Sequence, residues 1–138
     1  MLRVTPEPNP EVPVVPPPFT AIFAFETGGT VHETSTGIHP TSALELFPDL
    51  GPLSASDGIG AWEMDRGGRH RGQFIKNLFD ATGKHIGYVI TLFSITLVGS
   101  DRLEATTTSD FVLGDDWNAE PFFSGGVTRA TGSRIRAR

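Results

Sequence analysis

The sequence contains no cysteine. This absence excludes disulfide frameworks, cysteine-ligated zinc and thiol catalysis, and it is typical of proteins in a reducing cytoplasm. No apolar run approaches the ~20 residues that span a bilayer, and the first residues, Met1 to Pro6, lack the apolar core of a secretion signal. We therefore expect a soluble, cytoplasmic protein with no membrane partner.

An excess of basic residues is also missing, because the formal net charge is −5. Proteins that bind nucleic acid usually concentrate positive charge, whereas here only Arg69–Arg71 and the C-terminal arginines form small basic groups. No aromatic-rich RNA-binding motif accompanies them. We expect no nucleic-acid partner.

Signatures of metal binding and nucleophilic catalysis are absent as well. His32, His39, His70 and His85 do not have the spacing of metal ligands. There is no Gly-x-Ser-x-Gly nucleophile elbow, and the paired glycines lack the strand-to-helix context of a phosphate-binding loop. The sequence thus predicts neither a metal site nor a cofactor.

What the sequence does have is a regular series of strand-like segments separated by turn residues. Turns such as Asp80-Ala81-Thr82-Gly83-Lys84 are typical of β-hairpins rather than of helical crossovers. The pattern predicts an all-β protein, a single antiparallel up-and-down β-barrel of about eight strands. The predicted strands are Phe19–Glu26, Thr30–Thr36, Gly58–Asp65, Arg69–Phe79, His85–Val98, Leu103–Leu113 and Phe122–Ile135.

Two segments stand outside this pattern. Residues 1–18 hold seven prolines, and proline cannot donate to a sheet ladder, so we expect an extended N-terminal arm ahead of a barrel domain at residues 19–138. This arm is either disordered or strapped across the barrel or a neighbouring subunit. Residues 37–57 are long for a loop, so we expect a lid over one barrel mouth or a plug that closes it.

Turn lengths predict which side chains face the interior. A two-residue turn within Asp65–Arg69, followed by a three-residue turn with Gly83 in the left-handed conformation, places Trp62 on one face with the odd-numbered residues of the next two strands. We take this face as the interior because Glu63 and Lys76 lie on the other, and unpaired charges are costly to bury.

The predicted interior is mostly apolar with a few polar groups, which is the composition of a ligand pocket. Gln73 and Thr91 are the candidate catalytic residues, as hydrogen-bond donors to a carbonyl oxygen. An equally weighted alternative is a filled core in which these two side chains bond to each other. If the faces were exchanged, Glu63 and Tyr88 would line the interior instead. The candidate ligand-binding residues are Trp62, Met64, Arg71, Ile75, Asn77, Phe79, Val89 and Phe93.

The opposite face gathers Phe74, Tyr88, Ile90 and Leu92 into an apolar stripe. A monomer rarely exposes such a stripe, so a second subunit or the N-terminal arm should cover it. We expect a homodimer.

Several short motifs resemble those of known barrels. Gly60-Ala61-Trp62-Glu63, Phe79–Gly83, Ile95-Thr96-Leu97 and Thr131–Ile135 are similar to segments of lipocalin-like, calycin-type bacterial β-barrels. This resemblance implies a barrel over residues 19–135. The rhythm of the glycines around the 80–87 turn more loosely resembles allene-oxide-cyclase and dirigent-like barrels, which implies cofactor-free cyclisation of polyketide products in secondary metabolism, including [4+2] cycloaddition.

These observations lead to one leading hypothesis and two rivals. We expect a cofactor-independent cyclase or isomerase that holds a small hydrophobic, polyketide-like substrate in a reactive conformation, as a Diels-Alderase does. The first rival is a non-catalytic carrier of a similar molecule. The second is a structural module with a filled core.

Overall fold

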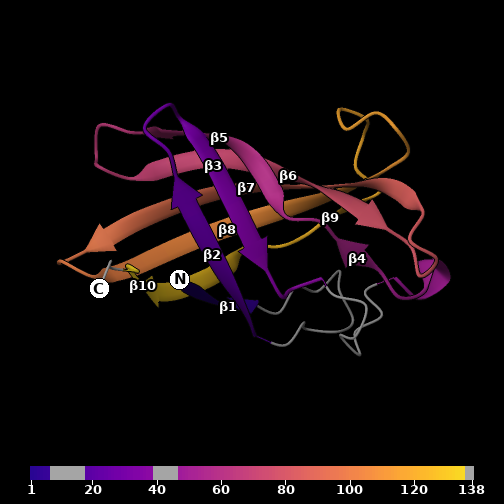
Figure 1. The fold of residues 1–138 in the computed structure, drawn as a ribbon, viewed down its shortest axis with the longest axis horizontal. Helices are drawn as coiled ribbons and strands as arrows, with labels where there is room; N and C mark the ends of the chain where they lie inside the picture. The colour runs from indigo at the N-terminus through magenta and orange to yellow at the C-terminus, as the bar shows by residue number, and fades with distance from the viewer. Residues whose placement is uncertain (7–17, 39–46, 136–138) are drawn as a thin grey trace.

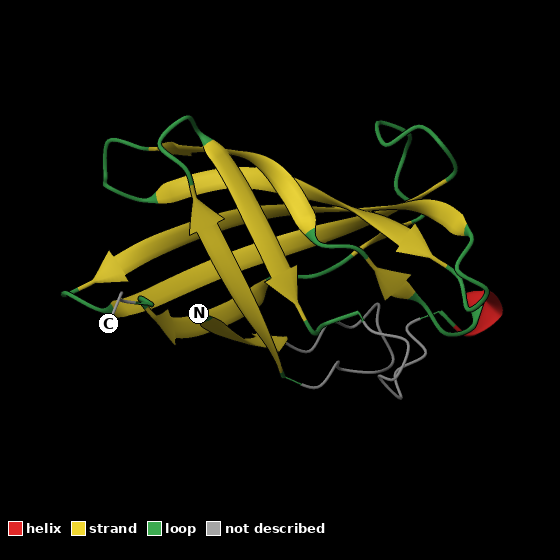
Figure 2. Cartoon of the chain, viewed as in Figure 1, coloured by secondary structure: helices red, strands yellow, loops and turns green. Residues whose placement is uncertain are grey.

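The computed structural model describes residues 1–6, 18–38 and 47–135. Within them the chain folds into a closed antiparallel β-barrel (Figures 1 and 2). Each barrel strand pairs with its neighbours in chain order, and β10 pairs with both β8 and β1, which closes the ring. The barrel strands are β1 (Leu2–Pro6), β2 (Phe19–Phe25), β3 (Thr30–Ser35), β5 (Gly58–Met64), β6 (His70–Phe79), β7 (His85–Val98), β8 (Arg102–Leu113) and β10 (Thr128–Ser133).

The predicted all-β, up-and-down barrel is therefore confirmed. Two short strands lie beside the ring: β4 (Ser54–Ala55) pairs with β6, and β9 (Phe123–Ser124) pairs with β8. The last predicted strand, Phe122–Ile135, is thus divided into β9 and β10. The one helical segment of the described residues is the 3₁₀ turn η1 (Pro48–Leu50). No described helix has the length and apolar character needed to cross a membrane.

The expected N-terminal arm needs a correction at its start, because residues 2–6 form β1. This strand lies between β10 and β2 and turns Leu2 and Val4 into the core, where they are 2% and 5% exposed. Proline did not prevent pairing, since Pro6 stands at the last position of the strand. Residues 7–17, the rest of the predicted arm, lie outside the described residues.

Turn geometry decides which residues face inward on β6. The β5–β6 hairpin has a three-residue turn, not the predicted two-residue one: Asp65 N–H donates to Arg69 O at 2.9 Å, and Gly68 takes a φ of +77°. The additional turn residue shifts the pairing of β5 with β6 by one position, so that Trp62 pairs with Gly72. The even-numbered residues of β6 therefore face inward instead of the predicted odd-numbered ones. The inward side chains of β6 are therefore Phe74, Lys76 and Leu78.

A β-bulge between β6 and β7 then returns the predicted, odd-numbered residues of β7 to the interior. The β6–β7 turn is the predicted three-residue one, with Gly83 at a φ of +82°. Between Leu78 and Phe79 the register shifts by one residue, because Leu78 pairs with Gly87 and Phe79 with His85. Val89, Thr91 and Phe93 consequently face inward, as expected.

The interior contains two apolar clusters, one toward each end of the barrel. The first includes Phe74, Phe93 and Ile95, with Trp62 packed against it. The second consists of Leu53, Leu78, Val89 and Phe111, and Phe47 and Leu50 pack against it. The described part of segment 37–57 thus places apolar side chains on the barrel core near the β6–β7 turn (Figure 1), as expected of a segment that covers one end. Residues 39–46 lie outside the described residues.

Candidate functional site

A layer of polar side chains lies between the two apolar clusters. On β6, Lys76 follows Phe74 of the first cluster and precedes Leu78 of the second. On β7, Thr91 lies in the same way between Phe93 and Val89. Interior-facing positions on β3 and β8 add further polar groups. We call this set the polar belt: Glu33, Ser35, Lys76, Thr91 and Ser109.

A buried ion pair is the most unusual feature of the polar belt. Lys76 Nζ lies 2.5 Å from Glu33 Oε2 and donates to Ser35 Oγ at 2.8 Å. The two residues are only 7% and 4% exposed. Their strands are held in place by β5, since Glu33 pairs with Gly58 and the register of β5 with β6 sets Gly58 opposite Lys76. A Cβ at position 58 would come within 2.6 Å of the Phe74 ring, so the space beside this glycine is filled by Phe74.

The remaining polar atoms of the belt are hydroxyl groups. Thr91 Oγ1 and Ser109 Oγ are 2.9 Å apart on the neighbouring strands β7 and β8. Thr91 is buried, whereas Ser35 and Ser109 are only partly buried although they occupy interior-facing positions. Part of each of these two serines is therefore accessible to solvent.

The chemistry of the belt is that of hydrogen-bond donors beside one carboxylate. An ammonium has three N–H donors; Glu33 and Ser35 are polar partners of Lys76, and its Nζ also lies over the Phe74 ring, 5.8 Å from the centroid. Buried ion pairs contribute little net stability, because desolvation offsets much of the attraction, so a functional role has to be considered. In the described part of the chain, no three His, Asp or Glu side chains converge as a metal site would require.

The structure brings only some of the predicted site residues into the interior. Trp62, Val89, Thr91 and Phe93 face inward. Met64, at the end of β5, is 59% exposed. The β6 candidates face outward because of the three-residue turn described above, and Phe79 follows the bulge and contacts His85 with ring centroids 5.9 Å apart. The misplaced β6 candidates are Arg71, Gln73, Ile75 and Asn77.

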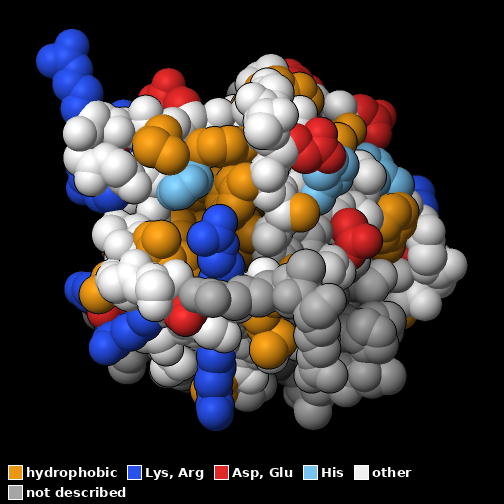
Figure 3. Space-filling model, turned by 60° about the vertical axis from the view of Figure 1, so that its left-hand side comes forward, with side chains coloured by type: hydrophobic (Ala, Val, Ile, Leu, Met, Phe, Trp, Pro, Cys, Tyr) orange, Lys and Arg blue, Asp and Glu red, His pale blue; other side chains and the backbone are white. Residues whose placement is uncertain are grey.

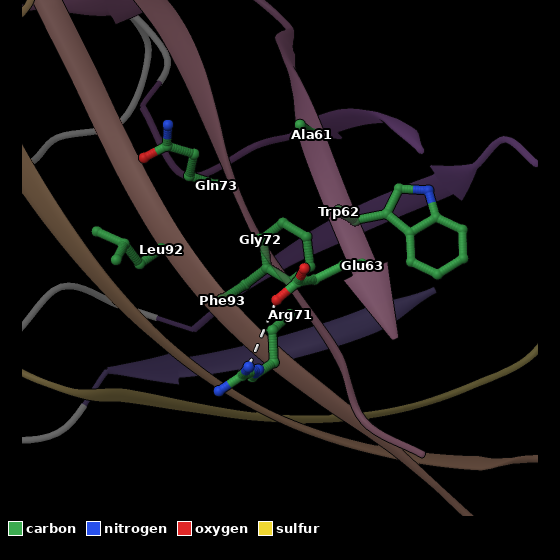
Figure 4. A pocket seen from close by; sticks show the side chains of 8 residues that line it. All are labelled: Ala61, Trp62, Glu63, Arg71, Gly72, Gln73, Leu92 and Phe93. Atoms are coloured by element: carbon green, nitrogen blue, oxygen red, sulfur yellow. Dashed lines mark hydrogen bonds and ion pairs between the residues drawn. The ribbon is translucent and has the colours of Figure 1, made fainter. Parts of the chain in front are cut away.

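Gln73 and Arg71 instead line an open hollow of about 510 Å³ on the outer face of β5–β6–β7 (Figure 4). Glu63 and Arg71 reach toward each other there, with 3.4 Å between Oε1 and Nη2. Both side chains are at least half exposed, so solvent screens their attraction. The hydrogen bond between Gln73 and Thr91 that the filled-core alternative requires is not formed, since these side chains lie on opposite faces.

Aromatic side chains surround the end of the barrel near the β5–β6 turn. Trp62 stacks on His70 with ring centroids 5.0 Å apart, and Phe25 contacts both rings edge-on or tilted. Trp62 Nε1 donates to Glu26 O at 3.0 Å, which fixes the indole. In the view turned toward this end, hydrophobic side chains gather in a recess beside a histidine and a basic side chain (Figure 3).

The residues that sequence reasoning missed are Glu33 and Lys76. Sequence reasoning places Lys76 outside because burying a single charge is costly, and its partner on β3 is 43 positions away in the chain. One signal was present: Lys76 alternates with Phe74 and Leu78 as a member of the same strand face. To predict that Lys76 is buried, one would also have to recognise an opposite charge at an interior-facing position of another strand.

We compared the chain with models of protein families, with curated proteins and with solved structures, and none of them matches it. The architecture is compatible with the lipocalin-like barrel expected from the sequence.

Proposed function

We propose that the barrel binds a small, mainly hydrophobic and electrically neutral molecule, and that the polar belt holds an oxygen of this ligand. The observation that carries the proposal is the buried Lys76–Glu33 pair between two apolar clusters. The apolar clusters would contact the hydrocarbon part of the ligand, and the remaining N–H of Lys76 would donate to its carbonyl or hydroxyl oxygen.

The charges of the belt favour a neutral ligand. Glu33 balances Lys76, and the other members are uncharged hydroxyl groups. A ligand carboxylate would bring a second negative charge into a region where Glu33 already pairs the only belt cation, and an uncompensated buried charge is costly. A ketone, aldehyde or alcohol carries no such cost.

A second candidate function is the cofactor-independent cyclase or isomerase expected from the sequence, acting on a polyketide-like substrate. The fixed ammonium of Lys76 favours it, because a positioned donor stabilises negative charge that develops on a carbonyl oxygen. Lys76 would then take the role expected of Gln73, while Thr91 keeps its interior place. Trp62 and Phe93 would shape the reactive conformation.

Binding is tested by titrating the full chain with neutral and acidic ligands of matched carbon skeleton, cinnamyl alcohol and cinnamic acid. Trp62 fluorescence reports the interior once the exposed Trp117 is replaced by phenylalanine. We expect saturable quenching by the alcohol and weaker binding of the acid. Lys76→Met should weaken alcohol binding, whereas Gln73→Leu, on the outer face of the same strand, should not. If Lys76→Met and Gln73→Leu bound the alcohol with equal affinity, the proposal would be contradicted.

Catalysis is separated from carriage by following a linear polyketide-type precursor by chromatography and mass spectrometry. An accelerated cyclic product that is lost in Lys76→Met would support the cyclase. A bound precursor that cyclises no faster than in buffer would support the carrier.

A further inference from the structure

The chain has only two lysines, and their environments are opposite. Lys84 lies exposed in the β6–β7 turn, whereas Lys76 is buried in the barrel beside a carboxylate. A lysine amine that is desolvated next to an acid–base partner is the arrangement that proteins use to form Schiff bases with carbonyl compounds.

We propose that Lys76 captures an aldehyde or ketone ligand covalently, as an imine, inside the barrel. This inference rests on the proposed function, because the carbonyl compound must first bind among the apolar clusters. It specifies the ligand class further: a hydrophobic molecule with a reactive carbonyl group.

Glu33 supplies the proton transfers of this reaction. One proton moves from Lys76 Nζ to Glu33 Oε2, 2.5 Å away, which frees the nitrogen lone pair. The nitrogen attacks the carbonyl carbon, and the electrons of the C=O π bond move to oxygen. One of the two protons now on the positively charged nitrogen passes to this oxygen, which gives a neutral carbinolamine while Glu33 keeps the proton it received. Glu33 then returns its proton to the carbinolamine hydroxyl, which leaves as water while the C=N bond forms. No oxidant, reductant or metal is consumed.

The product keeps the charge balance of the Lys76–Glu33 pair. A protonated imine carries the same single positive charge as the ammonium, so Glu33 remains its counter-ion. Ser35 Oγ, which accepts from Nζ at 2.8 Å, is placed to keep one hydrogen bond to the nitrogen. The reaction is reversible by hydrolysis, which would allow release of the ligand.

The experiment is reductive trapping of the full chain with cinnamaldehyde and sodium cyanoborohydride, followed by peptide mapping. The chain provides its own comparators: Lys84 and the α-amine of Met1, whose pKa is lowered by burial and which is therefore the more reactive competitor. We expect labelling of Lys76 to saturate with aldehyde concentration and to exceed that of Lys84 roughly tenfold or more, because a bound aldehyde is held beside the amine. Cinnamyl alcohol should compete at Lys76 and leave the other two amines unaffected.

Two variants test the roles of the pair. Lys76→Arg keeps a cation beside Glu33 but forms no trapped adduct, so it should bind the alcohol and lose the label. Glu33→Gln should slow labelling of Lys76 without changing that of Lys84. Labelling of Lys76 that is no faster than that of Lys84, or that the alcohol does not compete, would overturn the inference. If the alcohol still quenches Trp62 in that case, only the imine fails; if the alcohol does not bind, the proposed function fails as well.

Discussion

At the scale of single residues, the buried Lys76–Glu33 pair conflicts with the cheapest way to fill a barrel. Leucine or methionine at these positions would bury apolar surface without the desolvation of two charges. The pair is tolerated because Glu33 and Lys76 face each other across Gly58 and because Ser35 accepts a further hydrogen bond. Mutations of the pair can therefore measure separately what it contributes to stability and what it contributes to ligand binding.

We predict that breaking the pair destabilises the fold more than removing it. Lys76→Met or Glu33→Leu alone should lower the free energy of unfolding by about 3–5 kcal/mol, because each leaves one buried charge without a partner. The double variant should lose less than either single variant. Urea unfolding followed by circular dichroism provides the measurement.

The exposed pair Glu63–Arg71 is the matched control on neighbouring strands. Its coupling energy in the same kind of double-mutant cycle should stay below about 1 kcal/mol, because solvent screens it. A similar coupling energy for both pairs would contradict the buried character of Lys76 and Glu33.

At the scale of elements, two hairpins share one turn chemistry. Asp65 and Asp80 each begin a turn in which a glycine three residues later has positive φ and a basic residue follows. Each carboxylate accepts backbone N–H groups two and four residues further along the chain. Gly83 predicts the three-residue turn after Asp80 correctly. The turn after Asp65 has the same Asp-x-x-Gly-basic pattern and the same three-residue length, so the predicted two-residue turn there is wrong.

These turns predict a pH dependence. The backbone N–H of Arg69 is the main cause that lowers the pKa of Asp65, and the Thr82 hydroxyl is the main cause for Asp80. A carboxyl whose pKa is lower in the folded state stabilises the fold above its unfolded pKa, and this contribution is lost as the pH falls through the folded pKa.

Asp65→Asn should therefore reduce stability at neutral pH, and its difference from the unmodified protein should vanish in acid. NMR titration should place the midpoint of Asp65 below 3.8, its ordinary value. A midpoint at or above 3.8 would show that the turn does not favour the charged form.

The strand β1 makes a separate prediction, because the sequence pattern assigned it to an arm. Val4→Ala should lower the free energy of unfolding by about 2 kcal/mol, since it removes methyl groups from a side chain that is 5% exposed. Thr5→Ala, the exposed neighbour on the same strand, should change it little. Equal small effects would indicate that β1 does not close the barrel in solution.

At the scale of the whole molecule, the outer face of β5–β6–β7 still presents an apolar surface. Phe74, expected there, lies inside the barrel, and Ile59 and Ile75 take its place beside Ile90 and Leu92. Ile59 and Leu92 are 59% and 49% exposed, so a second copy of the chain remains the partner that we predict for this face.

Sedimentation equilibrium tests the homodimer. The unmodified protein should have about twice the chain mass, and Leu92→Glu should yield monomer because each charged side chain would face the apolar surface of the other subunit. Thr131→Glu, on the exposed side of β10, should remain dimeric. A monomer at high concentration of the unmodified protein would refute this prediction.

The sequence by itself determined the local features of this protein. Alternating side chains and turn residues specify strands such as β7 and turns such as that at Gly83, because strand period and left-handed glycine are properties of a few neighbouring residues. The barrel architecture followed, since successive hairpins leave few other ways to cover both edges of a sheet.

Only the tertiary structure decided which residues face inward and which segments close the ring. One turn residue and one bulge each reverse the face of a whole strand, so Gln73 and Lys76 exchanged places through differences of a single residue. The pairing of β1 with β10, and of Lys76 with Glu33, joins positions far apart in the chain. Whether such residues meet depends on the pairing register of every strand that lies between them, and no local sequence pattern specifies that register.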